Sequence, residues 1–229
     1  MASRLATLIR RLRTFHGAPV PPPVRDPYRL VLLEQVGYLA ADTDRLAAFR
    51  LLEQRVGTDP DAILRAPASV LRAVTRRGGA IAVSQRAARL RQVAHRVRAV
   101  WNGDLGPVRR LPLAQARREL ARYPAIGEPG AERILLLSGS HPVLGLDSNA
   151  LRVLQRLGYG KPAAQWAKAY RSAQRAGERQ LRPTVAARRE AYLLLREHGK
   201  TVCRRTAPRC QECPIRPDCP TGSARRRGA

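Results

Sequence analysis

Acidic residues, lysine and aromatic residues are all scarce in this chain of 229 residues. Asp and Glu number 17 against 43 Lys and Arg, which gives a formal net charge of +26 at pH 7. A field of that sign repels cationic partners and concentrates polyanions such as nucleic acid. Only three of the basic residues are lysines, Lys161, Lys168 and Lys200, so chemistry that needs a lysine amine has three candidates. The arginine excess suits phosphate contacts, and it is equally typical of codon use in a GC-rich genome.

Long hydrophobic runs are also missing. No apolar stretch approaches the ~20 residues that a membrane-spanning helix needs, so we expect no membrane partner. The 44% of hydrophobic residues, in a chain of this length, are enough for a globular core, which excludes disorder throughout the chain.

Strand-like alternation of apolar and polar residues does not occur convincingly anywhere. From Tyr28 onward, apolar residues recur at helical spacing, and the breaks are rich in Gly, Pro, Asp and Asn. The arginine-rich segment 1–25 resembles a transit peptide superficially, but Leu5, Leu8, Ile9 and Leu12 share one face of a basic amphipathic helix. We therefore expect an all-α chain of about ten short helices.

Cysteine is absent from the first 202 residues and then occurs four times in a short loop, as Cys203, Cys210, Cys213 and Cys219. Disulfides are disfavoured, because a helical domain of this size needs no covalent cross-links and the composition suggests an intracellular protein. Zinc ribbons usually separate two C-x₂-C pairs by about 15–20 residues, whereas this loop holds a single C-x₂-C. The spacing favours a [4Fe–4S] cluster, with zinc as the alternative.

Six, two and five residues separate successive cysteines, and Pro214 directly follows the third. This pattern resembles the C-terminal iron–sulfur loop of the endonuclease III family of DNA glycosylases. The resemblance implies a [4Fe–4S] cluster on the four cysteines that shapes the loop. The same loop holds four arginines that we expect to contact DNA phosphates: Arg204, Arg205, Arg209 and Arg216.

Residues 115–137 predict a helix, a tight turn and a second helix. Glycines at the start of a helix expose backbone N–H groups that can bind phosphate without reading sequence, although any helical hairpin needs such a turn. The segment resembles the helix–hairpin–helix of the same superfamily, which makes Ile126, Gly127 and Gly130 candidate DNA contacts. Ala125 replaces the first glycine of the family's Leu-Pro-Gly-Val-Gly turn, and it is strained if that position needs a positive φ.

Asp147 precedes an apolar helical pattern, and by pattern alone it is an ordinary N-cap. Its segment resembles the Asp-Thr/Ser-x-x-x-Arg-Val stretch of the family, which implies that Asp147 is the catalytic carboxylate. A carboxylate there can stabilise the cationic sugar that forms when an N-glycosidic bond breaks. The bifunctional members carry a lysine nucleophile where this chain has Pro129, so the resemblance implies a glycosylase with weak or absent AP-lyase activity.

Three residues near the start of the apolar region are further candidates. Gln35 matches the family's gap-filling glutamine, and Tyr38, one turn later, could stack on a base, although both are also consistent with plain helix residues. Glu34 is a candidate second acid or base.

The resemblance implies the two-lobed helix–hairpin–helix glycosylase fold, with a six-helix barrel over residues 18–141 and an iron–sulfur domain over residues 1–17 and 142–229. It implies a monomeric base excision repair enzyme that acts on a damaged or mismatched base in double-stranded DNA, located at the nucleoid in the bacterial cytoplasm. The alternatives are a non-catalytic protein of the same fold that binds damaged DNA, a bifunctional enzyme that recruits a distant lysine, and a zinc-dependent nucleic-acid-binding protein.

Overall fold

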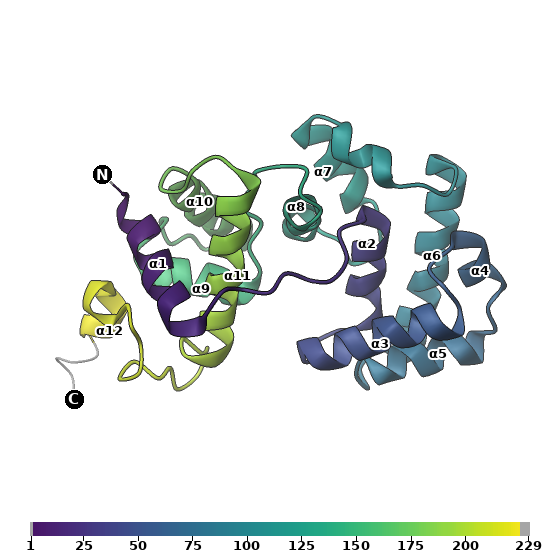
Figure 1. Cartoon of the computed structure of the whole chain (residues 1–229), viewed down its shortest axis with the longest axis horizontal. Helices are drawn as coiled ribbons and strands as arrows, with labels where there is room; N and C mark the ends of the chain where they lie inside the picture. The colour runs from purple at the N-terminus through teal and green to yellow at the C-terminus, as the bar shows by residue number, and fades with distance from the viewer. Residues whose placement is uncertain (1, 225–229) are drawn as a thin grey trace. The chain divides into compact units, whose positions relative to one another are not determined.

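The computed structural model describes residues 2–224, which form helices and no strand (Figure 1). The prediction of an all-α chain is confirmed. Twelve α-helices and two short 3₁₀ helices lie in this part of the chain, slightly more than the periodicity indicates, because four of them are only three to six residues long. None of the helices in the described part combines the length and the apolar composition that a bilayer crossing requires.

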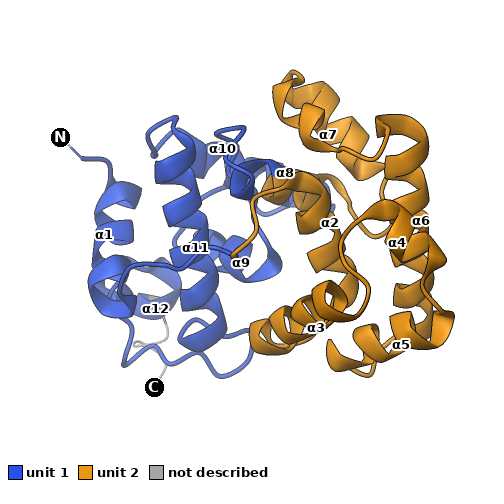
Figure 2. Cartoon of the chain, turned by 45° about the vertical axis from the view of Figure 1, so that its right-hand side comes forward, with its two compact units in different colours: residues 1–22, 135–229 blue, residues 23–134 orange. Residues whose placement is uncertain are grey.

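The chain divides into two compact units (Figure 2). Residues 23–134 form the continuous unit, and residues 1–22 with 135–229 form the discontinuous unit. The continuous unit holds α2 (Pro27–Val36), α3 (Asp42–Arg55), α4 (Pro60–Arg65), α5 (Ala68–Arg77), α6 (Val83–Trp101), η1 (Gly106–Arg110), α7 (Leu113–Ala121) and most of α8 (Glu128–Leu137). The discontinuous unit holds α1 (Arg4–His16), α9 (Ser148–Arg156), α10 (Trp166–Glu178), α11 (Val185–Thr201), η2 (Arg216–Asp218) and α12 (Pro220–Ala224).

Helix α2 is the central element of the continuous unit. It starts at Pro27 behind the N-cap Asp26, whose carboxylate accepts a hydrogen bond from the Arg29 N–H. Its residues are buried on nearly every side, since α3, α5 and α6 pack around it. A helix that is apolar all round is stable only inside a core. Glu34 and Gln35, near the end of this helix, are therefore carried into a largely buried position.

Helix α1 forms as the sequence predicts. Ser3 caps it by accepting a hydrogen bond from the Ala6 N–H, and Gly17 ends it at a φ of 79°. The apolar face that the sequence identifies, from Leu5 to Leu12, is buried against α11. This prediction of a basic amphipathic helix is confirmed.

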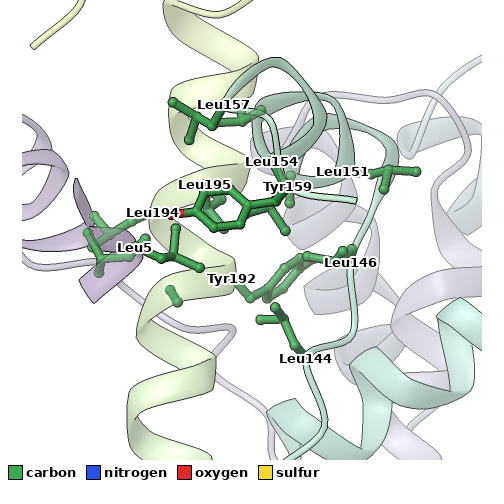
Figure 3. Packing of buried hydrophobic residues seen from close by; sticks show 14 of the residues in the cluster. Leu5, Leu144, Leu146, Leu151, Leu154, Leu157, Tyr159, Tyr192, Leu194 and Leu195 are labelled. Carbon is green, nitrogen blue, oxygen red and sulfur yellow. The ribbon is translucent and has the colours of Figure 1, made fainter. Parts of the chain in front are cut away.

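The core of the discontinuous unit forms around α11. Figure 3 shows Tyr192, Leu194 and Leu195 of this helix packed among side chains of α1, α9 and the extended segment before α9. Leu144 and Leu146 of that extended segment are buried in the same cluster. The packing fixes the chain directly before Asp147.

Candidate active site and cysteine loop

Asp147 caps α9 and binds a side chain of α11. Its Oδ1 accepts hydrogen bonds from the N–H groups of Asn149 at 3.0 Å and Ala150 at 2.8 Å. Its Oδ2 accepts a hydrogen bond from Arg196 Nε at 3.0 Å. The N-cap interpretation is confirmed. Three N–H donors complement the negative charge of the carboxylate.

The extended segment before Asp147 is fixed by one face of α10. Tyr170 Oη accepts a hydrogen bond from the Leu146 N–H at 3.1 Å. Glu178 Oε1 accepts one from the Leu144 N–H at 2.8 Å, and Gln174 Nε2 donates to the Leu144 carbonyl at 3.0 Å. Side chains four residues apart lie on the same face of a helix, so α10 presents all three groups to the segment. This arrangement orients Asp147 from outside its own helix.

Neither Arg196 nor the α10 contacts are evident from the sequence. Arg196 follows Asp147 by 49 positions and is one arginine among many. The spacing of Tyr170, Gln174 and Glu178 is a weak signal, because polar residues four apart are also typical of a solvated helix face.

The helical hairpin consists of α7, the turn 122–127 and α8. Ala125 adopts a φ of 59°, which confirms that this position needs the left-handed conformation and that alanine is strained in it. Of the three predicted hairpin contacts, Gly127 is exposed, whereas Ile126 and Gly130 are buried. Ile126 thus packs inside the hairpin, and any contact it makes with DNA would be through its backbone.

Pro129 is the second residue of α8 and half-buried. It supplies neither a nucleophilic amine nor a backbone N–H at the start of this helix. An internal ion pair instead joins the two helices of the hairpin: Arg117 Nη2 lies 2.8 Å from Oε1 of the fully buried Glu132. This ion pair holds α7 to α8.

Gln35 and Tyr38 differ in accessibility. Gln35 is 1% exposed, and its Nε2 donates to the Pro124 carbonyl at 2.7 Å. Its amide therefore anchors α2 to the hairpin turn. A buried amide needs a hydrogen-bond partner, and the apolar surroundings of α2 offer few others. Tyr38 follows α2 and is 51% exposed, so its ring is accessible to a partner. The predicted DNA contact of Tyr38 stays a prediction.

Glu34 is enclosed by two guanidinium groups. Its carboxylate lies 3.1 Å from Arg45 Nη1 and 3.5 Å from Arg133 Nη2. Burial by itself would raise the pKa of Glu34, but Arg133 and Arg45 outweigh it, and the pKa is lowered from its ordinary value of 4.5. A carboxylate that holds its charge so firmly is a poor proton donor near neutral pH. Its evident role is to join α2, α3 and α8.

The four cysteines line one pocket of the discontinuous unit, with about 360 Å³ of empty space that includes open solvent. None of the four forms a disulfide. Burial, and to a smaller degree the neighbouring thiols, raise the pKa of Cys213 to about 11. Among residues 2–224, no group of three or more His, Cys, Asp and Glu side chains is arranged so that it could hold a metal ion.

Hydrogen-bond groups surround the cysteine sulfurs. Arg156 Nη1 lies 3.3 Å from Cys203 Sγ, and the Gly222 N–H donates to Cys219 Sγ at 3.4 Å. His198 Nε2 lies 3.4 Å from Cys213 Sγ. N–H groups around sulfur stabilise thiolates, which is the form that binds a metal. Four cysteines in one pocket, with donors beside their sulfurs, are the donor chemistry that thiolate ligation of a metal uses.

Helix α9 links the cysteine loop to Asp147. Arg152 donates to the carbonyls of Cys203 and Gly199, and Arg156 donates to those of Arg204 and Arg205. The helix that begins at the candidate catalytic carboxylate thus fastens the start of the loop.

The four loop arginines are not equally accessible. Arg205 and Arg209 are exposed, whereas Arg204 and Arg216 are half-buried. Arg209 pairs with Glu212 at 3.6 Å on the surface, and Arg209 and Arg216 also line the cysteine pocket. Arg205 and Arg209 are therefore the better placed of the four to reach a phosphate.

No family model matches this chain, and no curated protein matches it. Solved structures do match. A trapped covalent intermediate of endonuclease III with DNA and a non-covalent endonuclease III–DNA complex each align with a TM-score of 0.75 at 19% identity, over 96% of this chain and 95% of the other. A thermostable thymine-DNA glycosylase aligns with a TM-score of 0.73 at 17% identity, over 96% and 95%.

A more distant match is the 3-methyladenine DNA glycosylase of H. pylori bound to 1,N6-ethenoadenine. It aligns with a TM-score of 0.61 at 16% identity, over 85% of this chain and 93% of the other. The matched proteins share an architecture and differ in the bases named for them. The chain therefore has the fold of endonuclease III and the related helix–hairpin–helix DNA glycosylases.

Proposed function

We propose that the protein is a DNA repair glycosylase that hydrolyses the N-glycosidic bond of a damaged or mismatched base in double-stranded DNA. The observation that carries the proposal is Asp147: a carboxylate held by two backbone N–H groups and Arg196, at the start of a helix, in a chain with the glycosylase fold. The net charge of +26 supports DNA as the partner. We expect a monomer that acts at the nucleoid in the bacterial cytoplasm.

In the proposed reaction the bond between the base nitrogen and C1′ breaks, and Asp147 stabilises the positive charge that develops on the sugar. A water molecule then bonds to C1′ and gives up a proton, and the departing base takes up a proton. Because a target base is reachable only outside the duplex, the enzyme must extrude it.

A lesion panel tests this proposal. Purified protein is incubated with duplexes that carry oxidised, deaminated, alkylated or mismatched bases, and free base is measured. We expect release from at least one duplex and its loss in Asp147→Asn. Asp59→Asn is the matched control, since Asp59 caps α4 in the same way through the Ala62 N–H and asparagine also caps well. The proposal is contradicted if no duplex releases a free base and Asp147→Asn binds these duplexes as the wild-type protein does.

We further propose that strand cleavage is weak or absent, because Pro129 offers no amine. Borohydride treatment on abasic-site DNA traps a Schiff base as a covalent adduct, so the wild-type protein is expected to give none. Pro129→Lys introduces an amine at this position and is the positive comparison. An adduct with the wild-type protein would mean that Lys161, Lys168 or Lys200 reaches the sugar.

A non-catalytic damaged-DNA-binding protein is the second candidate, and the Arg196 contact favours it, because that contact occupies one oxygen of Asp147. It predicts salt-sensitive binding to abasic-site analogues that survives Asp147→Asn, with no turnover. Base release that depends on Asp147 decides against it.

We propose that Cys203, Cys210, Cys213 and Cys219 hold a [4Fe–4S] cluster. The N–H groups near the sulfurs of Cys203 and Cys219, the His198 ring nitrogen near Cys213 and the shared pocket support thiolate ligation. When bound, the cluster supplies a rigid cross-link and a one-electron redox centre. Arg152 and Arg156 fasten the cysteine loop to α9. The exposed arginines of the loop are then held where they can contact phosphate. Iron, inorganic sulfide and zinc analysis of the purified protein distinguishes the cluster from a zinc site.

A further inference from the structure

Two histidines form a hydrogen-bonded chain that ends on one of the cysteines. His16, the last residue of α1, lies with its Nε2 3.1 Å from His198 Nδ1 on α11. The other ring nitrogen of His198, Nε2, lies 3.4 Å from Cys213 Sγ. His198 is 1% exposed and His16 is half-buried, so the chain runs from near the surface to the pocket. The proposed base removal does not use it.

The two contacts of His198 determine where its proton lies. Burial favours a neutral ring, which carries one N–H and one acceptor nitrogen. A metal-bound Cys213 is a thiolate and can only accept, so the His198 proton must lie on Nε2. Nδ1 is then an acceptor, and His16 Nε2 must donate to it. One arrangement of protons therefore satisfies both contacts.

The setting of His16 supports this order. The His16 ring meets the His198 ring edge to face, with 5.3 Å between the ring centroids. The ring of the preceding residue, Phe15, also meets the His16 ring edge to face, with 4.8 Å between centroids. These contacts restrict the orientation of His16, and so the nitrogen that faces His198. A partner that binds the far nitrogen of a histidine selects its tautomer and orients the ring, as outer partners do around metal ligands.

We propose that His198 donates a hydrogen bond to the Cys213 ligand, that His16 holds His198 in the donating tautomer, and that the pair thereby raises the reduction potential of the bound cluster. The inference rests on the proposed [4Fe–4S] cluster. A hydrogen bond to a ligand sulfur stabilises the more negative, reduced state, so a donor raises the potential and its loss lowers it. Both histidines act through Cys213 and are positioning residues.

Voltammetry and EPR titration of the purified holoprotein test the inference without a DNA substrate. His198→Leu removes the donor, and we expect a more negative potential. His198→Gln keeps an amide N–H and is expected to restore much of the wild-type value. His16→Phe keeps the aromatic contact with α11 but releases His198 Nδ1, so we expect a smaller negative shift. His95→Gln, at an exposed position of α6, is the matched control and leaves the potential unchanged.

Nitrogen-15 NMR of histidine-labelled holoprotein gives an independent readout, with His198 expected as the Nε2–H tautomer. If His198→Leu and His16→Phe both bind the cluster with the same reduction potential as the wild-type protein, the inference is overturned and the cofactor proposal stands. Should His198→Leu fail to fold, His16→Phe and the NMR tautomer decide the question. Wild-type protein with zinc, or with no iron and sulfide, overturns both proposals, and a His198 ring bound to the metal itself overturns the donor role.

Discussion

Arg196 Nε donates to Asp147 Oδ2 across 3.0 Å, and this contact joins α11 to the first residue before α9. Both side chains are largely buried, with exposed fractions of 24% for Arg196 and 19% for Asp147. A partly buried ion pair is stronger than one at the surface, because water screens it less. Arg196 thus orients the carboxylate that we propose to stabilise the cationic sugar.

Arg196→Gln is expected to slow single-turnover base release roughly tenfold, which corresponds to about 1.4 kcal/mol in the barrier. The glutamine removes the charge and the fixed donor, while the two backbone N–H groups still hold Oδ1. Affinity for an abasic-site analogue is expected to change less than the rate. Arg189→Gln, on the same helix, is the control for the loss of one positive charge. Equal losses of rate and affinity would assign Arg196 to DNA binding instead.

Tyr170→Phe is expected to lower both stability and the rate of base release. The substitution leaves the buried Leu146 N–H without the acceptor it has at 3.1 Å, which costs about 1–3 kcal/mol. The free energy of unfolding, from urea titration, measures the first effect.

Tyr28→Phe is the matched control for this substitution. Tyr28 is buried too, but its hydroxyl has no hydrogen-bond partner among the described residues, so its removal is expected to be neutral or slightly stabilising. Similar losses for both variants would contradict the role of the Tyr170 hydroxyl.

Ala125→Gly is expected to stabilise the protein. At a φ of 59° a residue with a Cβ is strained by roughly 1–2 kcal/mol, and glycine relieves that strain at a smaller cost in unfolded-state entropy. Ala88→Gly, at an exposed position inside α6, is expected to destabilise by about 1 kcal/mol. The same chemical change should thus shift the melting temperature in opposite directions, and a loss at both sites would mean that Ala125 is unstrained.

Local signals explain which features could be predicted from the sequence. The face of α1, the cap at Asp147 and the conformation of Ala125 depend on residues a few positions apart, which periodicity and turn chemistry describe. The contacts of Arg196, Tyr170 and the two histidines span 15 to 182 positions, and no local pattern marks them. Gln35 lies between these two cases. The unbroken apolar run from Leu30 to Leu33 indicates a helix that is buried on all sides, and this local signal argues against an exposed position for Gln35.

The Glu34 ion pairs predict a pH dependence of stability. The pKa of Glu34 is below its ordinary value of 4.5 in the folded chain, so the unfolded chain binds the proton more readily. The stabilisation is therefore present above pH 4.5 and is lost as the pH falls below 4.5 through the folded-state pKa. Glu34→Gln removes the charge at every pH, and it should lower the melting temperature at pH 7 and make the curve flatter in this acidic window.

Glu53→Gln is the matched comparison, because Glu53 pairs with Arg29 at a more exposed position of the same unit. Exposed pairs contribute about 0–1 kcal/mol, so its effect at pH 7 should be smaller. Thermal unfolding followed by circular dichroism from pH 3 to pH 7 measures all three proteins. If the difference between wild type and Glu34→Gln stays constant across that range, the two arginines do not hold the Glu34 charge, and an acid role for Glu34 becomes open again.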